Sequence, residues 1–206
     1  MYFRILHDES SGELGYLLAD TDAAEAVLVD PRGGDLPLLQ SLLAERGLRL
    51  RWVLRTHQHD AVMPNEMAML AHLGAPIVQG KPALETHSAA AGELLPFGNE
   101  VINVRATPGH TLHCLSYSWR DRLFCGGLLY GETCPHQPQP ASPQALWDSV
   151  RLQVFTLPDE TLLFAGHTHR AHAFTTVMEQ RRWHPLFAGL SRDEFLARVA
   201  TAAPGD

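Results

Sequence analysis

Histidines gather at three places in the chain, each just after an apolar run has ended. The three segments are "WVLRTHQH" with His57 and His59, "VRATPGH" with His110 and nearby His113, and "LLFAGHTH" with His167 and His169. Strand ends at one edge of an α/β sheet converge, and imidazole is a common ligand of zinc and other late divalent metals. The spacing therefore predicts one metal site built from separate strand ends.

A tripod of imidazoles is the chemistry that these clusters suggest. His57 and His59 can hold one metal from a single strand end, and His110 can complete the tripod from another. Three histidines and one open position for water form a catalytic zinc arrangement, in which the pKa of the bound water falls to about 7. We predict His57, His59, His110 and His167 as metal ligands. For catalysis we predict the first three of these together with His169.

The remaining histidines and the cysteines call for no special chemistry. A lone histidine is usually a capping or hydrogen-bonding residue, and we expect that role for His87, His136, His172 and His184. The three cysteines form no C-x-x-C pair and are odd in number, which argues against a disulfide framework or a thiolate zinc knuckle. We expect small buried side chains at Cys114, Cys125 and Cys134.

Length and composition are those of a soluble globular protein. The 206 residues suffice for one domain with a real core, and we expect a single domain over 1–206. With 45% apolar residues, 19% charged residues and a net charge of -7, neither nucleic acid nor an anionic membrane is expected as a partner. No apolar run approaches the roughly 20 residues needed to span a bilayer. The first residues lack a secretion-signal pattern, so a cytoplasmic location is expected.

Apolar runs and turn residues predict alternating strands and helices. The expected strands cover 2–8, 14–20, 24–31, 48–56, 75–80, 100–110 and 160–169, with a hairpin over 113–127. The expected helices cover 33–47, 64–74, 142–158 and 191–200. Asp35 is predicted to cap the first helix, and Ser191 with Glu194 to form a capping box on the last. The proline-rich stretch 130–143 should be a surface loop that borders the site.

Four segments together resemble the metallo-β-lactamase superfamily. They are "THQHDAV", "TPGHT", "FCGG" and "AGHTH", in this order along the chain. The superfamily's motif is T-H-x-H-x-D-H, then a P-G-H-T histidine, a G-D aspartate and a G-H histidine. The resemblance implies an α/β fold of the αββα sandwich type, with two mixed β-sheets packed face to face and helices outside.

Further segments resemble the persulfide dioxygenase and glyoxalase II branch of that superfamily. They include "YLLAD", "AVLVDP", "LWDSV", "FTLPDETLLFAGH" and "HPLFAGLSRDEF", and the later ones favour the dioxygenases. Members of this branch act on small thiol-derived molecules. The resemblance thus implies a small-molecule substrate, a thiol or a thioester, and a homodimer as the default assembly.

The chain departs from the family's motif at its other metal positions. The aspartate and histidine that should follow His59 are Ala61 and Val62, and the G-D aspartate is Gly127. The resemblance therefore implies at most a mononuclear site. Persulfide dioxygenases hold one iron with two histidines and that aspartate, here His57, His110 and Gly127. Without the carboxylate, the remaining imidazoles suit zinc better than iron.

Other residues could compensate for the missing carboxylates. Asp60 lies beside the lost acid but is displaced by one residue, which would turn it to the opposite face of an extended segment. His169 stands where the dioxygenases carry a tyrosine near the metal. His113 and Glu132 are weaker candidates. The glutathione-binding relatives also carry an arginine in the stretch that here reads "YGETCPHQPQP", and this arginine is absent.

Two functions remain open from the sequence. The first is a mononuclear metalloenzyme that hydrolyses a thioester or ester, or that oxidises a persulfide if iron is retained. The second is a non-enzymatic relative that binds a ligand or a partner, because Ala61, Val62 and Gly127 replace three motif positions together.

Overall fold

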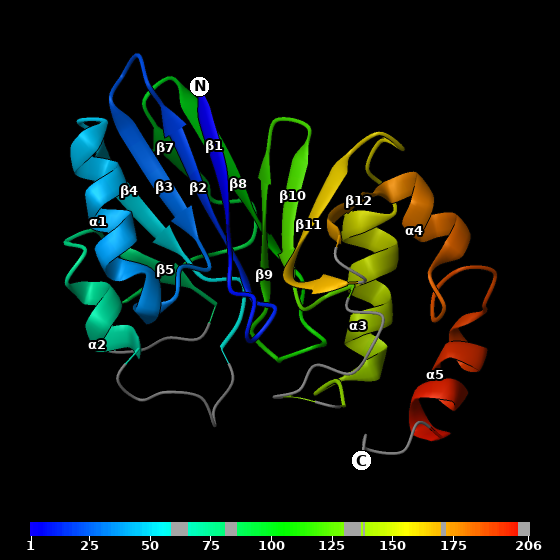
Figure 1. The fold of residues 1–206 in the computed structure, drawn as a ribbon. Coiled ribbons are helices and arrows are strands. Elements are labelled where there is room, and N and C mark those ends of the chain that lie inside the picture. The colour runs from blue at the N-terminus through cyan, green and yellow to red at the C-terminus, as the bar shows by residue number, and fades with distance from the viewer. Residues whose placement is uncertain (59–65, 81–85, 130–136, 138, 170–171, 202–206) are drawn as a thin grey trace.

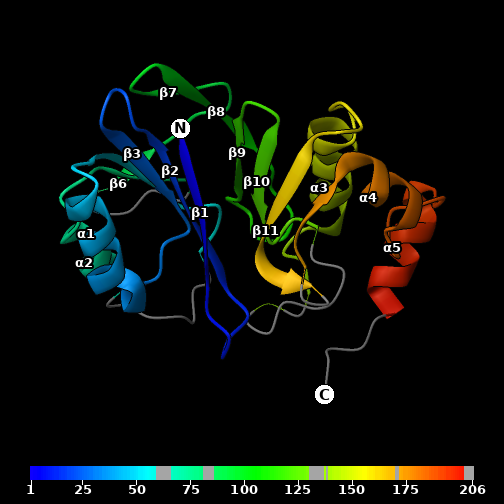
Figure 2. The same cartoon turned by 45° about the horizontal axis from the view of Figure 1, so that its top comes forward.

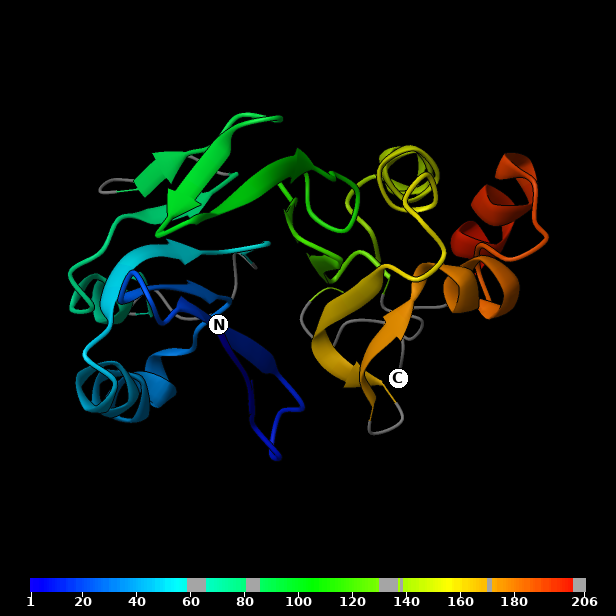
Figure 3. The same ribbon diagram turned by 90° about the horizontal axis from the view of Figure 1, so that it is seen from above.

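Two six-stranded β-sheets stand face to face, and helices cover the outer side of each, as Figures 1 and 3 show. Each sheet contains parallel and antiparallel pairs, so the predicted αββα sandwich of two mixed sheets is confirmed. The structure is a computed structural model. It describes residues 1–58, 66–80, 86–129, 137, 139–169 and 172–201.

The first sheet has its strands in chain order. They are β1 (Tyr2–His7), β2 (Leu14–Asp20), β3 (Glu25–Val29), β4 (Arg49–Leu54), β5 (Ile77–Gln79) and β6 (Thr86–Ser88). On its outer side lie the 3₁₀ turn η1 (Gly33–Asp35), α1 (Leu36–Glu45) and α2 (Glu66–Ala71). Every residue of β2 is buried, as expected for a strand covered on both faces.

The second sheet has the order β12-β11-β10-β9-β8-β7. Its strands are β7 (Leu94–Phe97), β8 (Glu100–Ala106), β9 (Leu115–Trp119), β10 (Arg122–Gly126), β11 (Leu162–His169) and β12 (His172–Thr176). Outside it lie α3 (Pro143–Ser149) with its π-helical continuation η2 (Val150–Val154), α4 (Val177–Trp183) and α5 (Arg192–Thr201), and Figure 2 shows the three α-helices on this side. None of the helices in the described ranges is both long and apolar enough to cross a bilayer.

The predicted elements are confirmed wherever they fall on described residues, and four more were missed. The missed ones are β6, β7, β12 and α4. The capping box on α5 is confirmed, since the Ser191 amide donates to Glu194 Oε2 at 2.8 Å and the Glu194 amide to Ser191 Oγ at 3.3 Å. The prediction for Asp35 is wrong. Its carboxylate binds the Arg32 guanidinium at 2.7 and 2.8 Å, and it makes no cap hydrogen bond.

An aromatic cluster joins the two sheets. Phe124 of β10 is fully buried, with its ring centroid 5.0 Å from that of Tyr16 and 5.3 Å from that of Phe164. Phe3 of β1 packs on the same group. Aromatic rings bury large apolar areas, and here they come from both sheets. This cluster holds the sheets at a fixed separation and so fixes the strand ends relative to each other.

The strand ends that matter for chemistry lie at one edge of the sandwich, the lower edge in Figure 1. There β4 leads to His57, and β8 leads through a Pro-Gly turn to His110. The same edge receives Gly126 at the end of β10 and His167 near the end of β11.

We expect Phe124→Ala to lower the free energy of unfolding by about 3–5 kcal/mol, because it leaves a cavity between the sheets. The matched control is Phe174→Ala. That ring is 52% exposed and touches the cluster from outside, 5.7 Å from the Phe164 ring. Urea denaturation of both variants measures the difference. Equal losses would mean that the cluster is not what joins the sheets.

Candidate functional site

His57 and His110 lie against each other. Their ring centroids are 4.9 Å apart and their planes nearly perpendicular, at 78°. His57 follows β4 of the first sheet, and His110 follows β8 of the second. The structure thus brings together two of the predicted ligands from opposite sheets.

The Pro108–Gly109 turn before His110 is held by α3. Gly109 has a φ of +143°, and a Cβ there would lie 2.3 Å from the backbone of Leu146. Ser149 of α3 donates a hydrogen bond to the Pro108 carbonyl at 2.7 Å. The close approach requires glycine, and it places the His110 ring, which is 5% exposed, inside the site.

A hydrogen-bonded chain runs from Asp30 through Thr56 to His57. The Asp30 carboxylate accepts the Thr56 amide and hydroxyl, both at 2.7 Å, and Thr56 Oγ1 lies 2.7 Å from His57 Nδ1. A hydroxyl has one proton, and an ionised carboxylate only accepts. Because Thr56 gives its proton to Asp30, His57 Nδ1 must donate to Thr56. The lone pair of His57 therefore lies on Nε2, as a metal ligand or a proton acceptor requires.

Asp30 is ionised at neutral pH although its carboxyl is enclosed. Burial raises the pKa of Asp30 to about 6, while hydrogen bonds from Thr56 and the charge of Arg55 oppose that rise. The folded chain thus holds this proton more tightly than the unfolded chain does. The contribution of Asp30 to stability falls as the pH rises from about 4 to about 6. Above that range the Asp30 carboxylate is charged and accepts the Thr56 hydroxyl proton, so the hydrogen bonds from Asp30 through Thr56 to His57 are in place.

Two glycines lie against these side chains: Gly126 against Thr56 and His57, and Gly127 against His110. At Gly126, with φ +54°, a Cβ would lie 2.2 Å from Thr56 Oγ1, so the hydroxyl chain requires glycine there. At Gly127 a Cβ would lie 2.6 Å from Cε1 and Nδ1 of His110. A side chain at 127 would therefore point at His110, as expected for a ligand position. In this chain the His110 imidazole lies in that space, and position 127 supplies no carboxylate.

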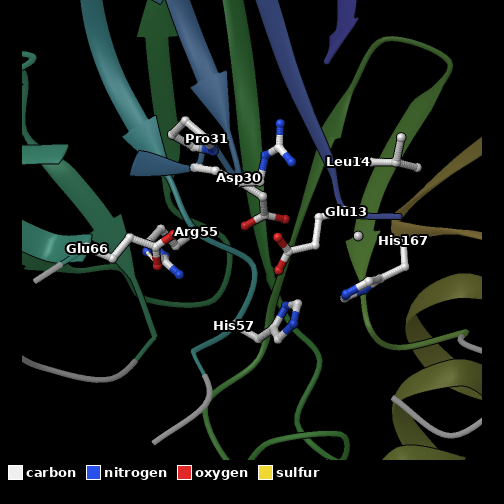
Figure 4. Close-up of a pocket in the computed structure, with 10 residues that line it drawn as sticks. Glu13, Leu14, Asp30, Pro31, Arg55, His57, Glu66 and His167 are labelled. Atoms are coloured by element: carbon white, nitrogen blue, oxygen red, sulfur yellow. Dashed lines mark hydrogen bonds and ion pairs between the residues drawn. The ribbon is translucent and has the colours of Figure 1, made fainter. Parts of the chain in front are cut away.

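Glu13 and His167 lie near His57 in the pocket that Figure 4 shows. His167 is 6% exposed, and its backbone forms an antiparallel bridge with that of Glu13. The Glu13 carboxylate points into the space between Asp30, His57 and His167. Sequence reasoning missed Glu13, because nothing in the turn after β1 indicated that it reaches β11.

Pockets open on both sides of His57. The one in Figure 4 also contains Arg55 and Glu66, which form an ion pair at 2.6 Å. The other has a volume of about 300 Å³, at the lower end of the range for small-molecule sites. Its lining includes Gln58, Gln79, Thr111, His113 and Gln137. His57 is the residue that both pockets share.

The described residues alone do not complete a metal site. Among them, no three His, Cys, Asp or Glu side chains form a group that could hold a metal ion. The predicted ligand His59 lies outside the described residues, as do Asp60 and Glu132, and the side chain of His169 is not described. The donors that are in place, His57 and His110, suit a metal that accepts imidazole and need a third ligand such as His59.

The residues predicted to be ordinary are ordinary where the structure describes them. His87 pairs with Glu93 at 2.6 Å, and His184 Nδ1 accepts the Leu186 amide at 3.1 Å. Cys114 and Cys125 are buried and unbridged. Burial raises the pKa of the Cys125 thiol to about 12, which makes it a poor nucleophile. His113 is exposed and lies at the rim of the second pocket. His136 and Cys134 lie outside the described residues, and the side chain of His172 is not described.

Comparison with known proteins identifies the family. The chain is 30% identical over 194 residues to human "Persulfide dioxygenase ETHE1, mitochondrial", a match covering 88% of this chain and 73% of the relative. It superposes on the crystal structure of ETHE1 from Myxococcus xanthus with a TM-score of 0.87 and 32% identity, covering 99% of this chain and 93% of that one. The chain belongs to the metallo-β-lactamase-fold family of persulfide dioxygenases and hydroxyacylglutathione hydrolases.

The second part of that family is equally well represented. Hydroxyacylglutathione hydrolase from Thermosynechococcus vestitus is 32% identical over 190 residues, covering 86% of this chain and 74% of the relative. No protein-family model matches the chain. Both kinds of relative are named as enzymes of small thiol-derived molecules, and the suspected branch of the metallo-β-lactamase family is thus confirmed.

We expect Thr56→Val to weaken zinc binding about 10–100-fold, because His57 loses the partner that fixes its tautomer. The matched control is Thr161→Val. Thr161 is a buried threonine that directly precedes β11, at the end of that strand away from His167. Zinc titration against a competing chelator measures both affinities. An unchanged affinity in Thr56→Val would show that the hydrogen bonds of Thr56 with Asp30 and His57 do not contribute to metal binding.

We expect Gly127→Ala to lower the free energy of unfolding by about 1–3 kcal/mol, since the new Cβ overlaps the His110 ring. Gly34→Ala is the control, because a Cβ at Gly34 meets nothing within 4 Å. Thermal or urea unfolding of the two variants gives the comparison. A neutral Gly127→Ala would show that His110 does not pack where the structure has it.

Proposed function

We propose that this member of the metallo-β-lactamase-fold family is a hydrolase of thioesters or esters that uses one divalent metal, zinc rather than iron. The proposed ligands are His57, His59 and His110, with His167 close by. The observation that carries the proposal is the series of hydrogen bonds from Asp30 through Thr56 to His57 Nδ1. These hydrogen bonds leave the lone pair on His57 Nε2, where it can bind a metal.

Hydrolysis is favoured over persulfide oxidation because of Gly127. The His110 ring lies where a carboxylate at that position would begin. Non-haem iron oxygenases depend on two histidines and one carboxylate, whereas imidazoles alone suit zinc. The 32% identity to a hydroxyacylglutathione hydrolase is matched by 32% identity to ETHE1 from Myxococcus xanthus, so the comparisons allow either reaction. The 30% identity to a persulfide dioxygenase keeps oxidation as an outcome that the assays must test.

In this proposal, different residues of the chain have different roles in hydrolysis. Zinc with an open coordination position supplies water with a pKa of about 7. Thr56 and Asp30 hold the His57 ring in one orientation and one tautomer. The predicted role of His169 is that of an acid or base beside the metal. The substrate would be a small thioester or ester that enters one of the pockets beside His57.

A second candidate is a non-catalytic relative that binds a ligand or a partner. The observation that favours it is the joint replacement of motif positions by Ala61, Val62 and Gly127. In that case the pockets beside His57 would bind a small molecule without transforming it.

Elemental analysis of protein purified without added metal is the first test. We expect about one equivalent of zinc per chain, lost in a His57→Ala/His110→Ala variant and retained in the control His87→Ala. His87 pairs with Glu93 and does not line either pocket at His57. Failure to bind zinc or iron under any loading condition would overturn the proposal.

Activity assays then decide the reaction. Hydrolysis of S-lactoylglutathione and of simpler thioesters would be run beside oxygen uptake with glutathione persulfide. Thioester hydrolysis that depends on His57 is the expected result. Oxygen uptake without hydrolysis would establish a dioxygenase, and the absence of both from metal-loaded protein would favour the non-catalytic candidate.

A further inference from the structure

The turn between β1 and β2 is held to the second sheet at the site. The Thr168 amide donates to the Gly12 carbonyl at 2.8 Å, and Glu13 forms a backbone bridge with His167. Gly12 has a φ of +73°, and a Cβ there would lie 3.2 Å from Thr168 Oγ1. Glu13 is therefore presented by a strand-like contact between the sheets and not by a loose loop.

The Glu13 carboxylate faces the pocket with one oxygen uncommitted. Oε2 accepts a hydrogen bond from Ser11 Oγ at 3.1 Å. Oε1 has no hydrogen-bond partner among the described residues. In Figure 4 this carboxylate points to the open space next to His57 and His167.

The other carboxylates of that pocket are already engaged. Asp30 holds Thr56 with both oxygens, and Glu66 holds Arg55 at 2.6 Å. Of the three carboxylates that line this pocket, Glu13 is thus the one able to act on a molecule inside it.

We propose that Glu13 transfers the proton in this hydrolysis and so takes the acid–base role that the sequence predicted for His169. Glu13 is a carboxylate brought in from the first sheet, where the motif's own carboxylate positions hold Ala61 and Gly127. This inference rests on the proposed thioester hydrolysis. Glu13 takes one proton from the attacking water while the water oxygen bonds to the thioester carbon. When the carbon–sulfur bond breaks, Glu13 returns the proton to the leaving thiolate. Thioester and water become a carboxylic acid and a thiol, and no oxidant or reductant is consumed.

Two substitutions test this role. General acid–base residues typically contribute 10²–10⁴-fold, so we expect Glu13→Gln and Glu13→Ala to lower kcat for S-lactoylglutathione or the best simple thioester at least about 100-fold. We expect KM and the zinc content to stay within about 3-fold of wild type. Glu9→Ala is the matched control, because Glu9 is an exposed carboxylate on the same turn.

Chemical rescue separates proton transfer from a structural effect. Formate should restore part of the activity of Glu13→Ala, whose smaller side chain leaves room for it, and should not restore Glu13→Gln. An active wild type with unchanged kcat in both variants would overturn the role of Glu13 and leave the hydrolase proposal standing. A loss of zinc or of cooperative unfolding in Glu13→Gln would overturn it as well, by making the residue structural. A zinc-loaded wild type that hydrolyses no thioester would overturn both proposals.

Discussion

The hydroxyl of Thr56, set between the Asp30 carboxylate and the His57 imidazole, is the interaction on which the rest of the site depends. It gives its one proton to Asp30 and so fixes which nitrogen of His57 is protonated. The Thr56 carbonyl accepts the Leu115 amide of β9 at 2.7 Å, which ties this strand end to the second sheet. The glycine at 126 follows from the same contact, because a Cβ there would lie 2.2 Å from the hydroxyl.

The sequence predicted the frame of this site because its signals are local. Apolar strands that end in histidine place His57, His110 and His167 at one edge, and the structure has each of them there. The same reasoning should have selected Asp30, which directly follows the apolar strand β3. Its role was missed because a single acid at a strand end does not by itself indicate a site. Its function becomes clear only from its hydrogen bond with Thr56.

Glu13 could not have been predicted, for a different reason. Its place depends on a bridge to His167, a residue far away in sequence that belongs to the other sheet. The sequence in the turn, "DESSGEL", is that of an ordinary polar turn. The false prediction for Asp35 has a related cause, since an arginine three residues earlier competes for the carboxylate that would have capped α1. In both cases the outcome depended on contacts that form only in the folded state.

One motif carboxylate position of the family holds a glycine in this chain, Gly127. At Gly127 the loss is matched by the position of the His110 ring, which fills the space where a Cβ would stand. In the pocket beside His57, Glu13 brings a carboxylate from another element. These two features are the basis on which we propose hydrolysis at this site and proton transfer by Glu13.

The protonation state of His57 tests the central claim most directly. Long-range ¹H–¹⁵N correlation spectra of the metal-free protein at pH 7.5, above the pKa of about 6 for Asp30, report the shifts of both ring nitrogens. The His57 signals can be assigned from a His57→Ala variant. The account predicts a protonated Nδ1 and an unprotonated Nε2, with that preference lost in Thr56→Val. A proton on Nε2 of the wild-type ring would contradict it.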